Sequence, residues 1–120
     1  MESGERGADF GWVRECALAL PGVAEGTSYG TPAFRVGKKF FLRLREDGAT
    51  LVLKTDFHER DHLLESDPAA FFTEDHYAGY PSVLIRLGAV PRGQLRTLIV
   101  EGWKRLAPAR QVAAYEAAQG

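Results

Sequence analysis

The chain has 120 residues, of which 45% are hydrophobic and 26% charged, with a formal net charge of −1 at pH 7. This length predicts one domain with a proper core, and the composition argues against disorder. Apolar runs long enough for a bilayer or a signal peptide are lacking, so we expect a cytoplasmic protein with no membrane partner. The single cysteine, Cys16, excludes an internal disulfide.

The first half of the chain predicts one helix followed by strands. Residues 1–8 are polar and glycine-rich, and we expect them to be flexible. Apolar residues then recur at helical spacing over 10–20, after Asp9 as N-cap, until Pro21 and Gly22 end the helix. Short alternating runs broken by glycine and proline follow, as is typical of antiparallel strands. We expect these strands near 26–30, 33–37, 39–46 and 49–55, with tight turns at 36–39 and 46–49.

The second half returns to helices around one more alternating run. A helix is predicted from its N-cap Asp56 to about residue 66, with a single helical turn after it over 66–72. Residues 82–90 alternate and predict a strand. An amphipathic helix is expected over 94–106, and a helical tail over 107–120. The order of elements predicts a two-layer α+β domain, in which helices pack on one face of an antiparallel sheet of about five or six strands.

The predicted helix after Asp56 contains a match to the zinc-peptidase motif HExxH, formed by His58, Glu59 and His62. On a helical wheel both histidines lie almost opposite Phe57, Leu63 and Leu64, so a helix packed through those apolar residues would expose both imidazoles. No third ligand is evident, since His76 lies in a loop-like stretch. We therefore assign no metal centre and no cofactor, although an i,i+4 histidine pair can still chelate zinc or nickel at a surface.

Strand alternation predicts a second candidate site on the sheet face away from the helices. Phe40, Leu42 and Leu44 are expected on the helix-covered face. The other face would carry basic residues beside one aromatic ring and could contact nucleic-acid phosphates. The candidate nucleic-acid-binding residues are Arg35, Lys38, Lys39, Phe41, Arg43, Arg45, Lys54 and Arg86. A solvated sheet face or a protein interface would place Lys and Arg there equally well.

Other motifs of catalysis are missing, because the sequence has no Walker-type loop, CxxC pair or GxSxG elbow. No residue spacing compels an enzyme, and we predict a non-enzymatic protein. Tyr29, Tyr77 and Tyr80 occur near predicted loops, where they could line a pocket or simply pack.

Two long segments together resemble the MmcQ/YjbR family of small bacterial proteins. The first contains "ALPGV" and "PAFRVG", and the second closes with "WKRLAPAR", so that the resemblance covers roughly residues 12–115. It implies a single two-layer domain and, by analogy with a double-wing DNA-binding domain, DNA binding; it implies no catalytic set. Tyr80 stands where relatives often have tryptophan, and the helix over 57–66 ordinarily carries no metal motif in the family.

Three hypotheses follow, and the first is a DNA-binding domain that uses the basic sheet face. The second is a module that binds a small molecule or a protein, through that face or through a pocket lined by tyrosines. The third is a zinc hydrolase that uses His58, His62 and Glu59. We expect a monomer or a weak dimer in each case.

Overall fold

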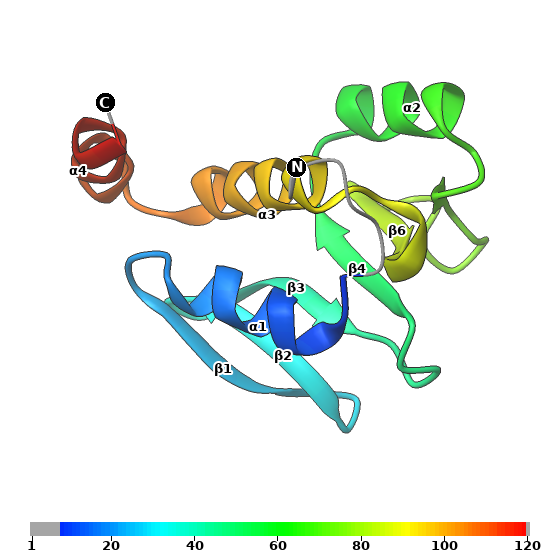
Figure 1. Cartoon of the computed structure of the whole chain (residues 1–120), viewed down its shortest axis with the longest axis horizontal. Coiled ribbons are helices and arrows are strands. Elements are labelled where there is room, and N and C mark those ends of the chain that lie inside the picture. The colour runs from blue at the N-terminus through cyan, green and yellow to red at the C-terminus, as the bar shows by residue number, and fades with distance from the viewer. Residues whose placement is uncertain (1–7, 120) are drawn as a thin grey trace.

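A computed structural model describes residues 8–119 as a six-stranded antiparallel sheet with helices packed against it (Figure 1). The strand order is β1-β2-β3-β4-β6-β5, so only the last two strands depart from chain order. The strands are β1 (Val23–Ser28), β2 (Thr31–Val36), β3 (Lys39–Leu44), β4 (Thr50–Lys54), β5 (Phe71–Phe72) and β6 (Ser82–Arg86). The predicted α+β class and two-layer arrangement are confirmed.

Helices bury one face of this sheet. They are α1 (Phe10–Leu18), α2 (Phe57–Ser66), α3 (Arg92–Leu106) and α4 (Ala109–Gln119), with a short 3₁₀ helix, η2 (Leu87–Ala89). α1 contacts β1 and α3, α3 contacts β3 and β4, and α2 contacts β5 and β6. Within residues 8–119, no helix has the length and apolar character needed to cross a membrane.

The central helix α3 holds the core together through a tryptophan and a glycine. Trp103 is fully buried, its indole N–H donates to the Pro21 carbonyl at 2.9 Å, and its ring meets that of Tyr115 on α4 edge-on. Gly102 lets α3 approach the sheet closely, because a Cβ there would lie 2.9 Å from Leu53 Cδ1 and 3.5 Å from Phe41 Cδ2. The helix therefore packs directly on β3 and β4.

Two predicted helix starts are confirmed by their capping bonds. The Asp9 carboxylate accepts a hydrogen bond from Trp12 N at 2.9 Å, and the Asp56 carboxylate accepts one from Glu59 N at 2.7 Å. The start of the chain differs in part from the prediction. Ala8, which we assigned to the flexible segment, is buried in the core, and residues 1–7 lie outside the described part.

The β1–β2 connection is a two-residue turn made by Tyr29 and Gly30. Their φ angles are 55° and 80°, and Ser28 pairs with Thr31 across the turn, as in a type I′ hairpin. Tyrosine is unusual at a left-handed position, because its Cβ crowds the backbone there. The turn directs an 81% exposed tyrosine ring out from the sheet.

A β-bulge corrects the predicted faces of β3. Phe34 pairs with Leu42 while the next residue, Arg35, pairs with Phe40, so Phe41 is left as the extra residue in β3. Phe41 is consequently turned toward α3 and is only 2% exposed, whereas Phe40 is 41% exposed on the other face. Strand alternation had placed these two phenylalanines on the opposite faces. Phe41 therefore belongs to the core and offers very little surface to a ligand, although it lines one small hollow of the sheet.

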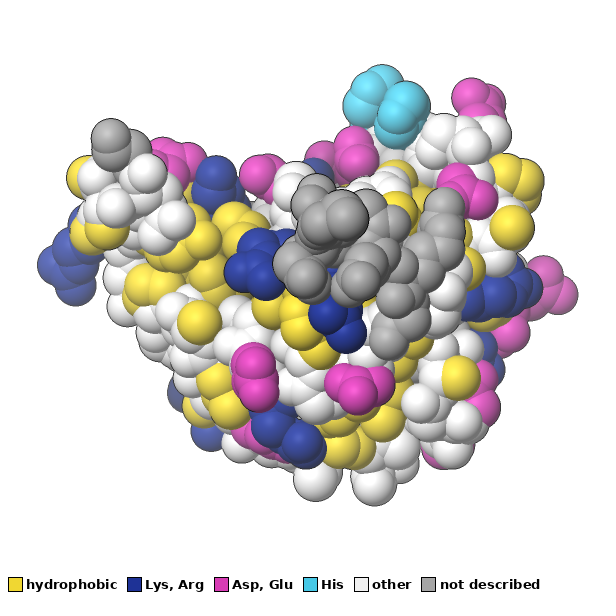
Figure 2. All heavy atoms as spheres, in the orientation of Figure 1, with side chains coloured by type: hydrophobic (Ala, Val, Ile, Leu, Met, Phe, Trp, Pro, Cys, Tyr) yellow, Lys and Arg dark blue, Asp and Glu magenta, His cyan; other side chains and the backbone are white. Residues whose placement is uncertain are grey.

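Smaller differences concern short or terminal elements. The predicted helical turn over 66–72 ends in β5, a two-residue strand that the sequence did not indicate, and the strand expected over 82–90 ends at Arg86 before η2. In α2, Leu63 is buried as predicted, but Phe57 is 46% exposed and lies under the Arg60 guanidinium. His58 and His62 are both exposed, which confirms their predicted side of the helix, and Figure 2 shows histidine side chains at the outer edge of the molecule above α2.

The β3–β4 turn depends on a single carboxylate, Asp47. Its two oxygens accept hydrogen bonds from Ala49 N, Thr50 N and Thr50 Oγ1 at 2.8–3.0 Å. These bonds, first of all the one from Ala49 N, lower the pKa of Asp47. The carboxylate form is therefore favoured by the folded chain more than by the unfolded chain.

We expect Asp47→Ala to lower the free energy of unfolding at pH 7 by about 0.5–1.5 kcal/mol, the net contribution of a typical hydrogen bond. Since the folded pKa lies below the unfolded value of about 3.9, this contribution is complete above that pH and is lost as the pH falls through the folded pKa. Urea denaturation of both proteins at pH 7 and near pH 3 measures it. A stability difference that grew toward low pH would contradict the role of the carboxylate.

Candidate functional site

The sheet face away from the helices carries a row of side chains that crosses five strands. Cross-strand pairing aligns Ala33, Arg43, Val52, Leu84 and Phe72 in that order from β2 to β5. Paired residues point to the same side of a sheet, so these side chains share one surface. Arg43 is the only charged member of the row and lies second in it, between Ala33 and Val52.

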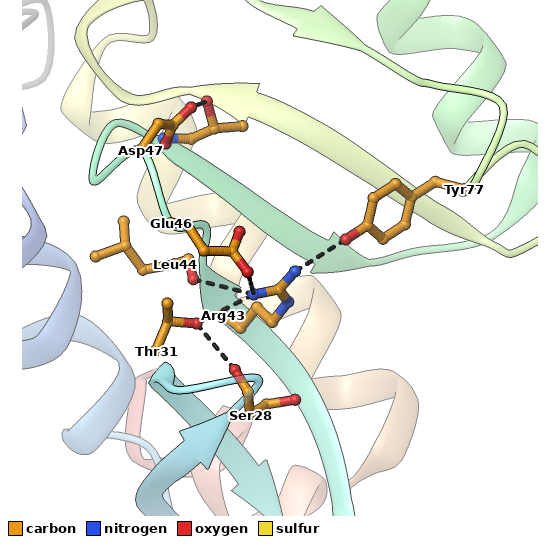
Figure 3. A network of polar contacts seen from close by, with 8 residues as sticks. Ser28, Thr31, Arg43, Leu44, Glu46, Asp47 and Tyr77 are labelled. Carbon is orange, nitrogen blue, oxygen red and sulfur yellow. Dashed lines mark hydrogen bonds and ion pairs between the residues drawn. The ribbon is translucent and has the colours of Figure 1, made fainter.

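Arg43 is held in place by two segments that are distant in the sequence (Figure 3). One guanidinium nitrogen donates to Thr31 Oγ1 at 3.0 Å and to the Leu44 carbonyl, while the other donates to the Tyr77 hydroxyl at 3.0 Å. The guanidinium also lies 5.1 Å from the centre of the Tyr29 ring. The β1–β2 turn and the segment 73–81 therefore meet at this side chain, and the Glu46 carboxylate lies 3.9 Å from its guanidinium.

Three adjoining hollows surround Arg43, which lines all of them. The largest has a volume of about 360 Å³ and the others about 290 and 190 Å³. The largest and the smallest share Lys54 and Ser82, and the two larger ones share Tyr29, His76 and Tyr77. We call this continuous depression the Arg43 groove. Its lining residues are Tyr29, Phe40, Phe41, Leu42, Arg43, Arg45, Glu46, Val52, Lys54, Glu74, His76, Tyr77, Tyr80, Pro81 and Ser82.

Exposed aromatic rings concentrate around the Arg43 groove. Among the described residues, five large hydrophobic side chains are substantially exposed, and three of them line the groove. These are Tyr29 at 81%, Tyr80 at 61% and Phe40 at 41% exposure. Exposed aromatic rings grouped beside cationic side chains are typical of an interaction site, because a bound partner removes the apolar rings from water.

The basic residues predicted for this face do not form one continuous patch. Arg43 and Lys54 lie together in the groove, and Arg35 reaches across Gly26 on the same face. Arg45 forms an ion pair with Glu74 at 3.2 Å, and this hydrogen bond raises the pKa of Arg45.

The remaining basic residues lie at the margins of the sheet. Arg86 stacks 4.0 Å from the Phe72 ring centre and donates to the Ala69 carbonyl. Lys38 and Lys39 are exposed at the β2–β3 turn and line none of the three hollows. The groove therefore contains Arg43 and Lys54 as its central cations, and the charge of Arg43 is partly balanced by Glu46 at 3.9 Å.

Sequence reasoning missed Phe40 and His76 as groove residues. Phe40 reaches the groove only because of the bulge, which no local pattern indicated. His76 enters through the return of segment 73–81 over the sheet, where its ring meets Tyr77 edge-on at 5.1 Å. The tyrosines considered for a pocket, Tyr29, Tyr77 and Tyr80, do line one.

The HExxH residues lie apart from the groove. Their helix presents both imidazoles to solvent, and within residues 8–119 no three His, Cys, Asp or Glu side chains are grouped so that they could hold a metal ion. Zinc hydrolases need three protein ligands around an accessible metal-bound water. The described residues do not assemble such a centre at His58 and His62.

Comparison with known proteins places the fold in a family. The YjbR family model matches residues 18–105, which run from the last residue of α1 to the last turn of α3 and include all six strands. This chain belongs to the YjbR family. The resemblance noted in the sequence is thereby confirmed.

Two mycobacterial proteins and one solved structure are similar to this YjbR domain. The uncharacterized proteins Rv2570 of Mycobacterium tuberculosis and Mb2600 of Mycobacterium bovis are each 40% identical over 58 residues, or 48% of this chain. The match spans only 45% of the length of these curated relatives. The crystal structure of Deinococcus radiodurans protein DR2400, with a DUF419 domain, has a TM-score of 0.72 at 20% identity and covers 86% of this chain and 80% of that one. This likeness shows the shared fold.

Proposed function

We propose that this YjbR domain is a non-catalytic nucleic-acid-binding domain, and that it binds single-stranded DNA in the Arg43 groove. The observation that carries the proposal is the set of three exposed rings, Tyr29, Phe40 and Tyr80, around the fixed Arg43 and the adjacent Lys54. Cations of this kind bind phosphates, and rings stack on bases.

The arrangement favours unpaired strands over a duplex. Exposed rings gain little from bases that are already stacked inside a double helix, whereas each unpaired base offers a free face. The groove is also bordered by segment 73–81, and the helices lie on the opposite side of the sheet, so no helix within residues 8–119 projects from this face to enter a major groove. A flexible strand can follow the depression from Phe40 past Arg43 to Tyr80.

The proposal is tested with a fluorescently labelled poly-dT strand and fluorescence anisotropy at low and moderate salt. We expect Tyr80→Ala to weaken binding by about 5- to 150-fold, corresponding to the loss of one stacked base. Lys54→Gln should weaken binding and reduce the slope of log affinity against log salt by about 0.7, the value for one phosphate contact on a single strand.

Matched changes outside the groove serve as controls. Phe57 is an exposed ring on α2, and Arg110 is an exposed cation on α4. Phe57→Ala and Arg110→Gln should leave the affinity unchanged. Absence of binding at low salt, or equal losses in the controls, would refute the proposal; tighter binding of duplex than of single strands would refute the preference.

A second candidate is a small anionic ligand held in the largest hollow. It is favoured by the way in which three hydrogen bonds fix Arg43, since a preorganised guanidinium suits a single phosphate or carboxylate. Such a ligand would bind with a shallow salt dependence and would not gain affinity with strand length. Titration with dT oligonucleotides of increasing length distinguishes the two candidates.

A further inference from the structure

The histidine pair of α2 is independent of the Arg43 groove and has no role in the function proposed above. His58 and His62 lie one turn apart on the helix, and both are exposed. Figure 2 shows histidine side chains grouped at the outer edge of the molecule above α2, where they project beyond the surrounding surface. Imidazoles at i and i+4 on a helix lie on the same side and can reach one ion together.

The surroundings of the pair favour a cation. Within α2 (57–66) there are three acidic side chains, Glu59, Asp61 and Glu65, and one basic side chain. That one cation, Arg60, is already engaged: it pairs with Asp61 at 3.2 Å, donates to the carbonyls of Ala78 and Tyr80, and covers the Phe57 ring. The negative charge near the histidines is therefore only partly neutralised, which raises the local concentration of metal ions.

One copy of the chain cannot complete a zinc site with these residues. Zinc prefers four ligands in a tetrahedron, and the described part of the chain brings no third His, Cys, Asp or Glu to this pair. Two copies supply four imidazoles. Because the histidines protrude from the edge of the molecule, a second α2 can approach them without displacing other elements.

We propose that His58 and His62 bind Zn²⁺ and that one ion joins two copies of the chain through their α2 helices. On the helical wheel, Arg60, which reaches toward segment 73–81, points away from the histidine side of the helix. The groove bordered by that segment consequently stays open in the dimer. Each dimer carries two Arg43 grooves.

Sedimentation velocity of the untagged full chain, with and without Zn²⁺, tests the proposal. We expect the 13.2 kDa protein to double in mass with half an equivalent of Zn²⁺ and to return to a monomer with EDTA. His58→Ala and His62→Ala should each abolish this doubling. His76→Ala, which removes the remaining histidine at the groove, should leave it intact.

Three results would overturn the inference. They are no zinc binding by calorimetry, binding of one ion per chain without a change in mass, and a doubling that survives loss of His58 or His62. Far-ultraviolet circular dichroism of the variants checks that α2 remains folded. The substituted positions are exposed, so we expect their spectra to match that of the parent chain.

Discussion

Replacing Trp103 by alanine is expected to lower the free energy of unfolding by about 3–5 kcal/mol, the usual range for removal of a buried aromatic ring. The side chain is fully buried where α3 meets the sheet, and it links α4 to the core through Tyr115. The change leaves a cavity and also removes the hydrogen-bond donor of the Pro21 carbonyl. Urea denaturation followed by circular dichroism measures the loss.

Trp103→Phe separates the two contributions. It keeps most of the ring in place but removes the indole N–H, so that the Pro21 carbonyl is left without its donor. We expect a smaller loss of about 0.5–1.5 kcal/mol, the net contribution of a typical hydrogen bond, because Pro21 is only half-buried. A loss below 1 kcal/mol for Trp103→Ala would contradict the position of this residue in the core.

The second large effect concerns the neighbouring phenylalanines of β3. Phe41→Ala should destabilise the fold by about 3–5 kcal/mol, because Phe41 is 2% exposed beneath Gly102 of α3. Phe40→Ala should change stability little, since Phe40 is 41% exposed on the other face. The same change should weaken binding of single-stranded DNA if the Arg43 groove is the site, because it removes one ring from the smallest hollow.

This pair of variants also tests the bulge itself. A regular strand without the extra residue would bury Phe40 and expose Phe41, and the stability changes would be reversed. Parallel urea titrations of the two proteins decide the matter. The binding measurement for Phe40→Ala is interpretable because that variant is expected to remain folded.

The helix starts, one turn and the exposed side of α2 could be predicted from the sequence, because each depends on interactions between residues close together in the chain. Asp9 and Asp56 begin helices as N-caps, and the Asp47–Gly48 pair turns the chain between β3 and β4. Helical phase placed His58 and His62 opposite Leu63, which is buried. In each case residues within a few positions of one another carry the relevant interaction.

The bulge and the groove could not be predicted in the same way. Alternation assigns side chains to the two faces of a sheet only where every residue of a strand is paired. The extra, unpaired Phe41 reverses the predicted faces of Phe40 and Phe41 in β3. β5 is two residues long and exists because it pairs with β6. The groove requires Tyr77 to meet Arg43, a contact across 34 positions of sequence.

The distribution of charge shows the same limit. Alternation correctly placed Arg43 and Arg45 on the same face, but it could not indicate that Glu74 would pair with Arg45. Nor could it indicate that Arg86 would stack on Phe72. The basic residues predicted for one face are therefore reduced to Arg43 and Lys54 in the groove, with Arg45 paired to Glu74 beside them.

The turn at Tyr29 has a consequence for any attempt to engineer this domain. A left-handed backbone position costs a side chain with a Cβ about 1 kcal/mol or more, a strain that glycine avoids and asparagine reduces. Tyr29 nevertheless occupies it at φ 55°, with its ring at the rim of the groove. A selection for thermal stability alone would thus favour glycine or asparagine in place of Tyr29, and would remove a ring that the proposed ligand contacts. Thermal stability and ligand affinity should be screened together at this position.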